Sequence, residues 1–313
     1  MIAVVTPGDG TLSVDERPDP TPGKEEVLVS VRSAGINGAD RLQRAGLYPP
    51  PPGAPADIPG LELAGEVTAL GEGVDDSWQG KRVAAIVAGG GQAGLCVVHH
   101  TSLLELPDSV DWTAAGGFAE TFSTAHDALI GQAALVSGER LLITGAAGGV
   151  GTAAIQIALL KGAEVVASVR NEELRAKVAE LGATVVEPGA EGDAGPFDVV
   201  LELVGAPNVA SNLALVNTGG RIVVIGVGAG AKTELNLLLL MAKRAKIMGS
   251  TLRARSNAEK ACVAAGVTSD LLPALGDGTL SVPVEATFAL ADAAAAYERF
   301  DAGAKFGKIV LIT

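Results

Sequence analysis

The chain has 313 residues, which is enough for two domains, and 48% of them are hydrophobic, which supplies material for full cores. Its formal charge of −13 at pH 7 speaks against nucleic acid or an anionic membrane surface as a partner, because both require basic patches. No apolar run is long enough to span a bilayer, and neither the first residues nor the two cysteines indicate export, so we expect a cytoplasmic protein.

The first third of the chain is predicted to form short strands separated by Gly and Pro turns. The clearest strand segments are Val27–Val31, Glu62–Ala69, Arg82–Val87 and Leu95–Val98. This spacing favours an irregular, β-rich unit. The proline-rich stretch Tyr48–Ala56 is predicted to form a stiff, extended loop.

After Trp112, apolar strands alternate with amphipathic helices. Strands are predicted at Arg140–Thr144, Val165–Val169, Thr184–Val186, Asp198–Leu203, Arg221–Ile225 and Ala245–Gly249. Helices are predicted at Val150–Lys161, Glu172–Leu181 (with Asn171 as its N-cap) and Asn208–Val216. The alternation predicts an α/β fold with a Rossmann-type, doubly wound parallel sheet covered on both faces. The run Leu237–Leu240 is interpreted as core or as a subunit contact.

The tail of the sequence, Glu285–Thr313, is predicted to contain a strand, the helix Ala291–Asp301 and the strand Lys308–Ile312. It is too short to bury a core of its own, so we expect it to complete the N-terminal β-rich unit. The expected domains are therefore a discontinuous β-rich one, residues 1–114 with 258–313, and an α/β one, residues 115–257.

The glycine-rich stretch Thr144–Ala158, TGAAGGVGTAAIQIA, joins the first strand of the α/β region to its helix. Compared with the G-x-G-x-x-G fingerprint, it keeps the second and third glycines, where Gly148 admits a pyrophosphate and Gly151 allows close helix packing. N–H groups at the helix start then bind the phosphates, so the predicted cofactor contacts are Ala147, Gly148, Gly149, Val150 and Gly151. The strand–turn–helix context disfavours the alternative, a tight turn that needs only small residues.

The end of the second α/β strand selects between the two nicotinamide cofactors. NAD sites place an acidic residue there to hold the ribose hydroxyls, whereas this chain has Ser168, Arg170 and Asn171. Arg170 can bind a 2′-phosphate, with Ser168 or Asn171 assisting, so we predict NADPH. Two alternatives remain: Arg170 is a solvated turn residue, or Glu172 or Glu173 reaches a ribose instead.

Several motifs together resemble the zeta-crystallin-type quinone oxidoreductases, a zinc-free branch of the medium-chain dehydrogenase/reductase superfamily. They are Gly138-Glu139-x-x-Leu142 with the glycine turn and Gln156, AGINGADRLQRAGLYPPPP at residues 34–52, and PGLELAG at residues 59–65. GGGQA at residues 89–93 and LRARS at 252–256 are similar to the tumour-suppressor-inducible branch. The resemblance covers the whole chain. It implies a GroES-like catalytic domain, an active cleft between the domains, and a homodimer in which Ala245–Gly249 pairs with its symmetry mate.

The resemblance also implies a catalytic nicotinamide site made of Asn37, Asp40 and Tyr48. Tyr48 would donate a hydrogen bond or a proton to the reduced oxygen, and Asn37 would hold substrate or nicotinamide. Asp40 would either act there or only orient its neighbours. Further cofactor contacts implied by the resemblance are Thr124, Val204, Gly226 and Thr251.

A metal is not expected in this site. Zinc relatives require thiolate and imidazole ligands, whereas Asn37 and Leu61 stand in the matching places. Hydride transfer without zinc needs a small-molecule acceptor with its own electron sink, such as a quinone or a conjugated enone. NADPH-dependent quinone reduction is the leading hypothesis. Reduction of an enoyl thioester or a 2-alkenal stays open, as does an NADPH-binding protein without significant turnover.

Overall fold

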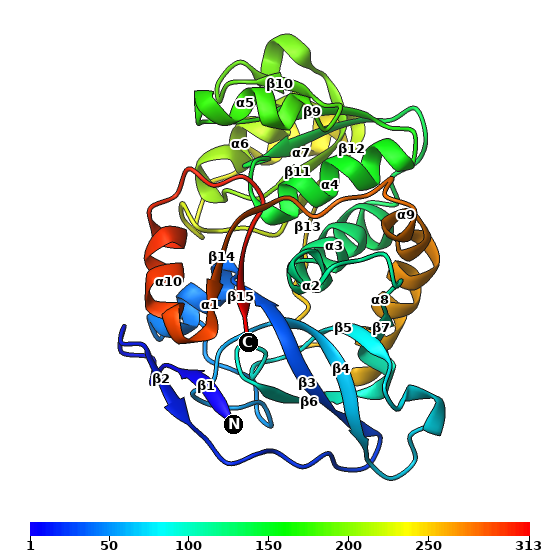
Figure 1. The fold of residues 1–313 in the computed structure, drawn as a ribbon. Helices are drawn as coiled ribbons and strands as arrows, with labels where there is room; N and C mark the ends of the chain where they lie inside the picture. The colour runs from blue at the N-terminus through cyan, green and yellow to red at the C-terminus, as the bar shows by residue number, and fades with distance from the viewer. The chain divides into compact units, whose positions relative to one another are not determined.

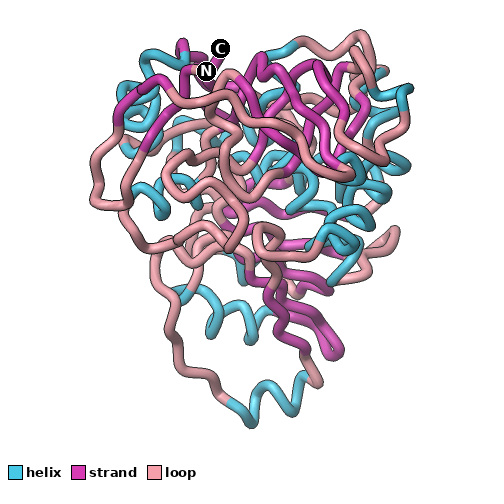
Figure 2. Tube along the Cα trace, turned by 90° about the horizontal axis from the view of Figure 1, so that it is seen from below, coloured by secondary structure: helices cyan, strands magenta, loops and turns pink.

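The computed structural model describes the whole chain, from Met1 to Thr313. The chain divides into two compact units, each with its own sheet (Figure 1). The first unit comprises Met1–Ser123, Leu252–Gly303 and Lys308–Thr313, and the second comprises Thr124–Thr251 and Ala304–Gly307. Both termini belong to the first unit, and Figure 2 marks them. None of the helices combines the length and apolar character that crossing a membrane requires.

A seven-stranded sheet forms the centre of the first unit, in the order β14-β15-β3-β4-β5-β7, with β6 also pairing with β3. A separate hairpin joins β1 to β2. The strands are β1 (Ile2–Val5), β2 (Ser13–Glu16), β3 (Glu26–Gly35), β4 (Glu62–Leu70), β5 (Arg82–Ile86), β6 (Leu95–His99), β7 (Leu103–Glu105), β14 (Val284–Ala289) and β15 (Lys308–Ile312). The helices are α1 (Gly38–Arg44), α2 (Trp112–Gly116), α3 (Ala119–His126), α8 (Asn257–Asp270), α9 (Leu272–Gly276) and α10 (Ala293–Asp301).

The tail of the sequence completes this sheet, as expected. The predicted strand Lys308–Ile312 is confirmed as β15, which pairs antiparallel with β3 so that Val310 faces Gly35. Helix α2 packs on β3, β4 and β15, which keeps residues up to Ser123 in the first unit. Helix α3 therefore begins in the first unit and ends in the second.

Two cores stabilise the first unit. Alternate residues of β3 bury Val27, Val29 and Val31 in one of them, and Cys96 of β6 packs beside these valines. The other surrounds Tyr297 of α10, whose side chain is fully buried.

The two tryptophans also pack in the first unit. Trp78 is partly buried against the core of β3, and Trp112 opens α2 beneath Arg82. The Arg82 guanidinium carbon lies 4.4 Å from the centroid of the Trp112 ring, which is a cation–π contact.

The second unit contains a six-stranded, fully parallel sheet in the order β10-β9-β8-β11-β12-β13. Its strands are β8 (Arg140–Thr144), β9 (Glu164–Ser168), β10 (Thr184–Val186), β11 (Phe197–Glu202), β12 (Val216–Val224) and β13 (Lys246–Gly249). Its helices are α4 (Gly149–Leu160), α5 (Glu172–Ala179), α6 (Ala206–Leu215) and α7 (Leu237–Lys243). Helices α4 and α5 contact β8, β9 and β10, whereas α6 and α7 contact β11 and β12. Because parallel crossovers are right-handed, the two pairs of helices cover opposite faces of the sheet. The doubly wound fold is therefore confirmed.

Local predictions in the second unit held, with most element ends within two residues of the expected ones. Asn171 is the N-cap of α5, since its Oδ1 accepts the Glu173 N–H at 3.0 Å. Strand β12 starts earlier than expected because Val216 pairs with Phe197 before the ladder shifts register. The leucine run is divided: Leu239 and Leu240 are partly buried against the core of the sheet, whereas Leu237 is 65% exposed and Leu238 is 78% exposed on α7.

Candidate functional site

The glycine turn lies between β8 and α4 in the second unit. Gly145 begins the turn with a φ of +64°, which glycine adopts without strain. A Cβ at Gly151 would lie 2.4 Å from the carbonyl oxygen of Ala146, so only glycine lets α4 pack this closely. At Gly148 the nearest atom would be 3.7 Å away, which leaves room in front of the helix. Because first-turn N–H groups have no partner within a helix, this end suits a phosphate.

The loops after β11 and β12 belong to the same edge of the sheet as the glycine turn. A Cβ at Gly145 would lie 3.2 Å from Cγ2 of Val204, and a Cβ at Gly226 would lie 2.1 Å from the carbonyl oxygen of Leu203. The strand order reverses between the neighbours β8 and β11, and doubly wound sheets bind ligands at such a switch point. The fold thus brings the predicted contacts Val204 and Gly226 close to the glycine turn.

Glu202 shapes the loop that carries Val204, a role that was not predicted. The side chain is fully buried at the end of β11. Its Oε1 accepts the backbone N–H groups of Val204 and Gly205, both at 2.7 Å, and its Oε2 accepts from Nδ2 of Asn212 at 2.6 Å. The sequence held one signal for this role, an acidic residue at the end of an apolar strand. A carboxylate that is buried there must accept hydrogen bonds from nearby donors.

A segment from near the end of the chain, Ala304–Gly307, lies on the glycine turn. The N–H of Gly307 donates to the carbonyl of Ala147 at 2.9 Å, and Gly307 pairs with Gly148 in a parallel bridge. Phe306 of this segment lies beneath Lys177 of α5, with 6.0 Å between Nζ and the ring centroid. The backbone of Ala304–Gly307 therefore packs against one side of the glycine turn.

The end of β9 carries the three residues predicted to bind a 2′-phosphate. Arg170 is exposed and makes no hydrogen bond or ion pair, so its guanidinium is free to bind an anion. Asn171 Oδ1 is engaged as the cap of α5, and the Ser168 hydroxyl donates to Oε1 of Glu191 at 2.7 Å. The predicted assistants of Arg170 thus already have partners within the protein.

Glu191 brings an acidic group to this strand end from a loop that is distant in the sequence. It opens a short 3-10 turn, Glu191–Ala194, that follows β10. Its Oε2 also accepts the N–H of Gly189 at 2.7 Å, which fixes the carboxylate beside Ser168. Since β9 and β10 are parallel neighbours, both loops leave the same edge of the sheet.

Two further predicted cofactor residues lie at the ends of the second unit's main segment. Thr124 is buried on α3, and Thr251 is exposed just after β13. No hydrogen bond joins either residue to the glycine turn.

Asn37 and Asp40 meet in a buried polar cluster of the first unit. Asp40 of α1 accepts the N–H of Asn37 at 2.8 Å and that of Gly60 at 3.1 Å. Nδ2 of Asn37 donates to Oε1 of Glu62 at 2.9 Å. Nζ of Lys308 donates to Oδ1 of Asn37 and to Oε1 of Glu62, both at 2.6 Å.

The surroundings of Asp40, for which two roles were left open, are buried and polar. Its carboxylate is not exposed at all, and both of its oxygens are held by backbone N–H groups. Burial raises the pKa of Asp40 to about 6, against the lowering effect of the Asn37 N–H. In this structure each oxygen of the Asp40 carboxylate is thus bonded to a backbone N–H, one of them that of Asn37.

The partners of Asn37 were not predicted. Glu62 opens β4 and Lys308 opens β15, and their side chains are 0% and 3% exposed. A lone charge at the start of an apolar strand was the available signal, because a buried charge requires a partner. Which residues would pair depends on the tertiary fold.

Tyr48 lies in the loop after α1 and is held by Arg253. Nη1 of Arg253 donates to the backbone carbonyl of Tyr48, and Nε donates to that of Ala88, both at 2.9 Å. The guanidinium carbon also lies 5.0 Å from the centroid of the Tyr48 ring. Burial raises the pKa of Tyr48, so its hydroxyl keeps its proton at neutral pH. This hydroxyl makes no hydrogen bond within the protein and can donate one to a ligand.

Glu120 stands beside the same cluster and was not predicted. Its backbone N–H donates to Oε2 of Glu62 at 2.9 Å, and the residue as a whole is partly exposed. Burial, together with the charges of Glu62 and Asp40, raises the pKa of Glu120 to about 8.

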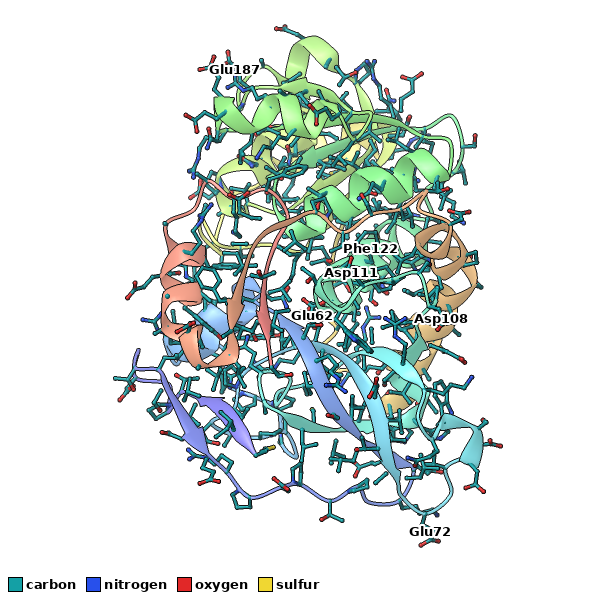
Figure 3. The ribbon with its side chains drawn as sticks, in the orientation of Figure 1. Glu62, Glu72, Asp108, Asp111, Phe122 and Glu187 are labelled. Carbon is teal, nitrogen blue, oxygen red and sulfur yellow. The ribbon has the colours of Figure 1, made fainter.

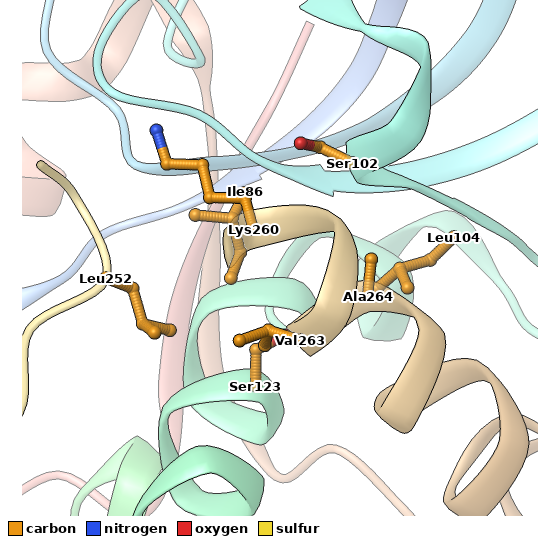
Figure 4. A pocket seen from close by; sticks show the side chains of 8 residues that line it. All are labelled: Ile86, Ser102, Leu104, Ser123, Leu252, Lys260, Val263 and Ala264. Atoms are coloured by element: carbon orange, nitrogen blue, oxygen red, sulfur yellow. The ribbon is translucent and has the colours of Figure 1, made fainter. Parts of the chain in front are cut away.

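Two hollows occur in the first unit. The smaller, about 10 Å³, has room for about one water and is lined mostly by apolar side chains of β5, α8 and neighbouring segments (Figure 4). The larger is an open groove of about 470 Å³, a size typical of small-molecule sites. It is lined by the loop Pro51–Pro55, by Val87–Gly89, and by Arg253–Asn257 with Lys260 of α8.

Comparison with known proteins agrees with this arrangement. Residues 23–133 match the model of the alcohol dehydrogenase GroES-like domain, and residues 149–265 match that of the zinc-binding dehydrogenases. The chain is 30% identical to the quinone oxidoreductase of Rattus norvegicus over 94% of this chain and 91% of the relative. It is 39% identical to part of a polyketide synthase from Streptomyces halstedii, over 64% of this chain and 4% of the synthase.

A solved structure extends the comparison to the whole fold. The quinone oxidoreductase from Thermus thermophilus, which was also solved with NADPH, superposes with a TM-score of 0.82. The match covers 100% of both chains at 32% sequence identity. By its relatives, its two domain models and its doubly wound fold, the chain is an oxidoreductase and belongs to the quinone oxidoreductase group of the medium-chain dehydrogenase/reductase superfamily.

Proposed function

We propose that this protein is an NADPH-dependent quinone oxidoreductase that transfers hydride without zinc. The observation that carries the zinc-free chemistry is the position of Lys308. Asn37 and Leu61 offer neither thiolate nor imidazole, and the Lys308 ammonium lies 2.6 Å from both Asn37 Oδ1 and Glu62 Oε1. A positive charge of the protein's own thus fills the surroundings that a metal would need, so the residues do not fit zinc.

NADPH fits the residues of the second unit. The open helix start at Gly148 suits its pyrophosphate, and the free guanidinium of Arg170 suits its 2′-phosphate. When bound, NADPH supplies a hydride from its nicotinamide ring.

The first unit supplies polar contacts for the acceptor. The Tyr48 hydroxyl donates a hydrogen bond to the acceptor oxygen, on which negative charge develops as hydride arrives. Asn37 uses one amide hydrogen on Glu62 and keeps the second for substrate or nicotinamide. Asp40 fixes Asn37 through its backbone N–H. The groove beside Pro51–Pro55 is large enough for a bicyclic quinone.

An acceptor screen tests this function. The purified chain is mixed with NADPH and with naphthoquinones, 2-alkenals or crotonyl-CoA, and loss of nicotinamide absorbance is followed. We expect the highest kcat/KM with quinones and no loss of rate after treatment with a zinc chelator. Loss of activity with chelator and recovery with zinc would contradict the zinc-free proposal. Tight NADPH binding without turnover of any acceptor would favour a binding protein.

Enoyl-thioester reduction remains the second candidate function. It is favoured by the 39% identity to a stretch of a polyketide synthase, the highest identity among the relatives compared above. The hydride of NADPH would then be transferred to the β-carbon of the enoyl thioester. A kcat/KM for crotonyl-CoA above those for all quinones in the screen would establish this alternative.

We further propose that the protein forms a homodimer through β13. This strand ends the parallel sheet and leaves one edge unpaired, and α7 beside it exposes Leu237, Leu238 and Met241. We expect a dimer mass by sedimentation at micromolar concentration and a shift toward monomer for Leu238→Glu. Val136→Glu, at another exposed apolar position, is the control and should remain dimeric. A monomeric wild type would contradict the proposal.

A further inference from the structure

The groove of about 470 Å³ in the first unit has a charge opposite to that of the whole chain. The sequence has 36 acidic residues and 23 lysines and arginines. In the wall of the groove, by contrast, Arg253, Arg255 and Lys260 stand with a single acidic residue, Glu26. Oε2 of Glu26 already accepts the N–H of Gly23 at 2.8 Å. The wall thus carries an excess of positive charge.

Other acidic residues of the first unit lie outside this wall. Figure 3 shows Glu72 in the loop after β4 and Asp108 in the loop after β7, and neither lines the groove. Glu259, near the start of α8, does not line it either, and its Oε2 accepts the N–H and the hydroxyl of Ser256 at 3.0 and 2.7 Å. A concave wall that carries mainly one sign of charge attracts the opposite charge. The groove therefore suits an anion although the protein as a whole is acidic.

Lys260 is the cation of the groove that is available to a ligand. It is half-buried near the start of α8 and makes no hydrogen bond or ion pair. Its stem lines the smaller hollow with Leu252 and Val263, and Figure 4 shows its ammonium pointing away from both. Because Lys260 also lines the groove, the two hollows share this side chain, with the stem packed on apolar neighbours. A packed stem loses less freedom when the ammonium binds a ligand.

Arg253 adds a second cation whose position is fixed. Its Nε donates to the carbonyl of Ala88 and its Nη1 to that of Tyr48, both at 2.9 Å, and Nη2 donates to Oε1 of Gln43. Burial lowers the pKa of Lys260, and the charge of Arg253 lowers it further, against the raising effect of Glu120. The two cations of the wall therefore repel one another, and an anion bound beside both would offset this repulsion.

Arg253 also connects the groove to the residue proposed to bind the acceptor oxygen. Its guanidinium carbon lies 5.0 Å from the centroid of the Tyr48 ring. Pro51–Pro55, which lines the groove, continues the loop that carries Tyr48. An acceptor whose oxygen is bound by the Tyr48 hydroxyl can therefore extend a substituent along the groove toward Lys260.

We propose that the groove binds an anionic group of the acceptor through Lys260 and Arg253, which deepens, and rests on, the function proposed above. The acceptor class is a quinone or enone that carries a sulfonate, carboxylate or phosphate. The Lys260 ammonium donates hydrogen bonds to the anionic oxygens, and the Arg253 guanidinium attracts them while it holds Tyr48. The anionic group takes no part in hydride transfer. Its binding therefore sets which acceptors are preferred and acts mainly on KM.

The test compares two quinones that differ by one negative charge. The ratio of kcat/KM for 1,4-naphthoquinone-2-sulfonate to that for 1,4-naphthoquinone is measured at saturating NADPH. Comparing the same ratio between variants cancels the effect of the sulfonate on the reactivity of the ring. We expect Lys260→Met to lower the ratio roughly 10-fold, mainly through KM of the sulfonate, and Lys260→Arg to keep most of it. Lys81→Met, which removes a charge at the other end of β5, is the control and should leave the ratio unchanged.

A second pair of acceptors distinguishes two sources of the anion. Crotonyl-CoA carries phosphates, whereas crotonyl-pantetheine does not. A preference for crotonyl-CoA that Lys260→Met abolishes would identify the phosphates of a thioester as the anion. A loss confined to the sulfonated quinone would identify a substituent of the ring. If Lys260→Met changes neither ratio while wild type reduces quinones, this proposal alone is overturned.

A binding measurement tests the groove without turnover. Naphthalene-2-sulfonate and the neutral 2-naphthalenemethanol are titrated calorimetrically into wild type and Lys260→Met. We expect the sulfonate to bind wild type more tightly, and expect Lys260→Met and added salt to remove this difference. Equal affinity of wild type for the two compounds would overturn the proposal. Failure of wild type to reduce any acceptor would overturn the proposed function, and the titration would still decide whether the groove binds an anion.

Discussion

Replacing Lys308 by methionine should lower the free energy of unfolding of the first unit by about 3–5 kcal/mol. The substitution keeps an unbranched side chain, one atom shorter, and removes its charge. It leaves the Glu62 carboxylate, which is 0% exposed, without the ammonium 2.6 Å away. It also removes the donor of Asn37 Oδ1 and of the Ile36 carbonyl. Urea unfolding of wild type and Lys308→Met gives the difference directly.

Two companion variants show whether burial is the reason. Lys81→Met breaks an exposed ion pair with Glu105 and should cost less than about 1 kcal/mol. Adding Glu62→Gln to Lys308→Met removes the stranded charge and should recover much of the loss. If Lys308→Met and Lys81→Met lower the free energy of unfolding equally, the buried pair does not stabilise the unit more than an exposed pair does.

Replacing Arg170 by alanine should weaken NADPH binding by roughly 10- to 150-fold and leave NADH binding nearly unchanged. A charge-assisted bond to a phosphate contributes about 1.5–3 kcal/mol, which corresponds to this range. Arg170 is exposed and has no partner in the protein, so the loss reports on the 2′-phosphate alone. Calorimetric titration of both cofactors against wild type and Arg170→Ala measures it, and added salt should reproduce part of the loss.

Glu191 provides the complementary variant. Its carboxylate is fixed beside Ser168, where it repels a 2′-phosphate and can accept from ribose hydroxyls. Glu191→Gln should therefore strengthen NADPH binding relative to NADH. If Arg170→Ala loses equal affinity for NADPH and for NADH, Arg170 is a structural residue of the turn. Tighter binding of NADH than of NADPH by wild type would contradict the assigned cofactor.

Local sequence pattern was sufficient for most of the second unit. The strand Arg140–Thr144 and the cap Asn171 were predicted correctly because each follows from residues within one turn or strand. The start of β12 was missed because it depends on Phe197, a residue on another strand. The leucine run Leu237–Leu240 shows the same limit, because hydrophobicity alone does not tell which of its side chains the rest of the protein covers and which stay exposed.

The candidate site likewise has a part that could be predicted from local sequence and a part that could not. The glycine turn was predictable because its residues are contiguous and each glycine has a steric reason. The surroundings of Asn37 were not, because Glu62, Glu120 and Lys308 come from distant parts of the chain. Glu191 likewise reaches Ser168 only because two parallel strands end together. Charged residues that the fold buries against one another leave no local pattern.

The aromatic side chains give the molecule an optical asymmetry. Both tryptophans, Trp78 and Trp112, and both tyrosines, Tyr48 and Tyr297, lie in the first unit. Tryptophan and tyrosine emission therefore arises from that unit alone, whereas far-ultraviolet circular dichroism records the helices of both. If the units unfold in separate steps, the two signals will diverge along one denaturation curve. The protein thus carries its own fluorophores for the unit that contains Lys308 and Glu62.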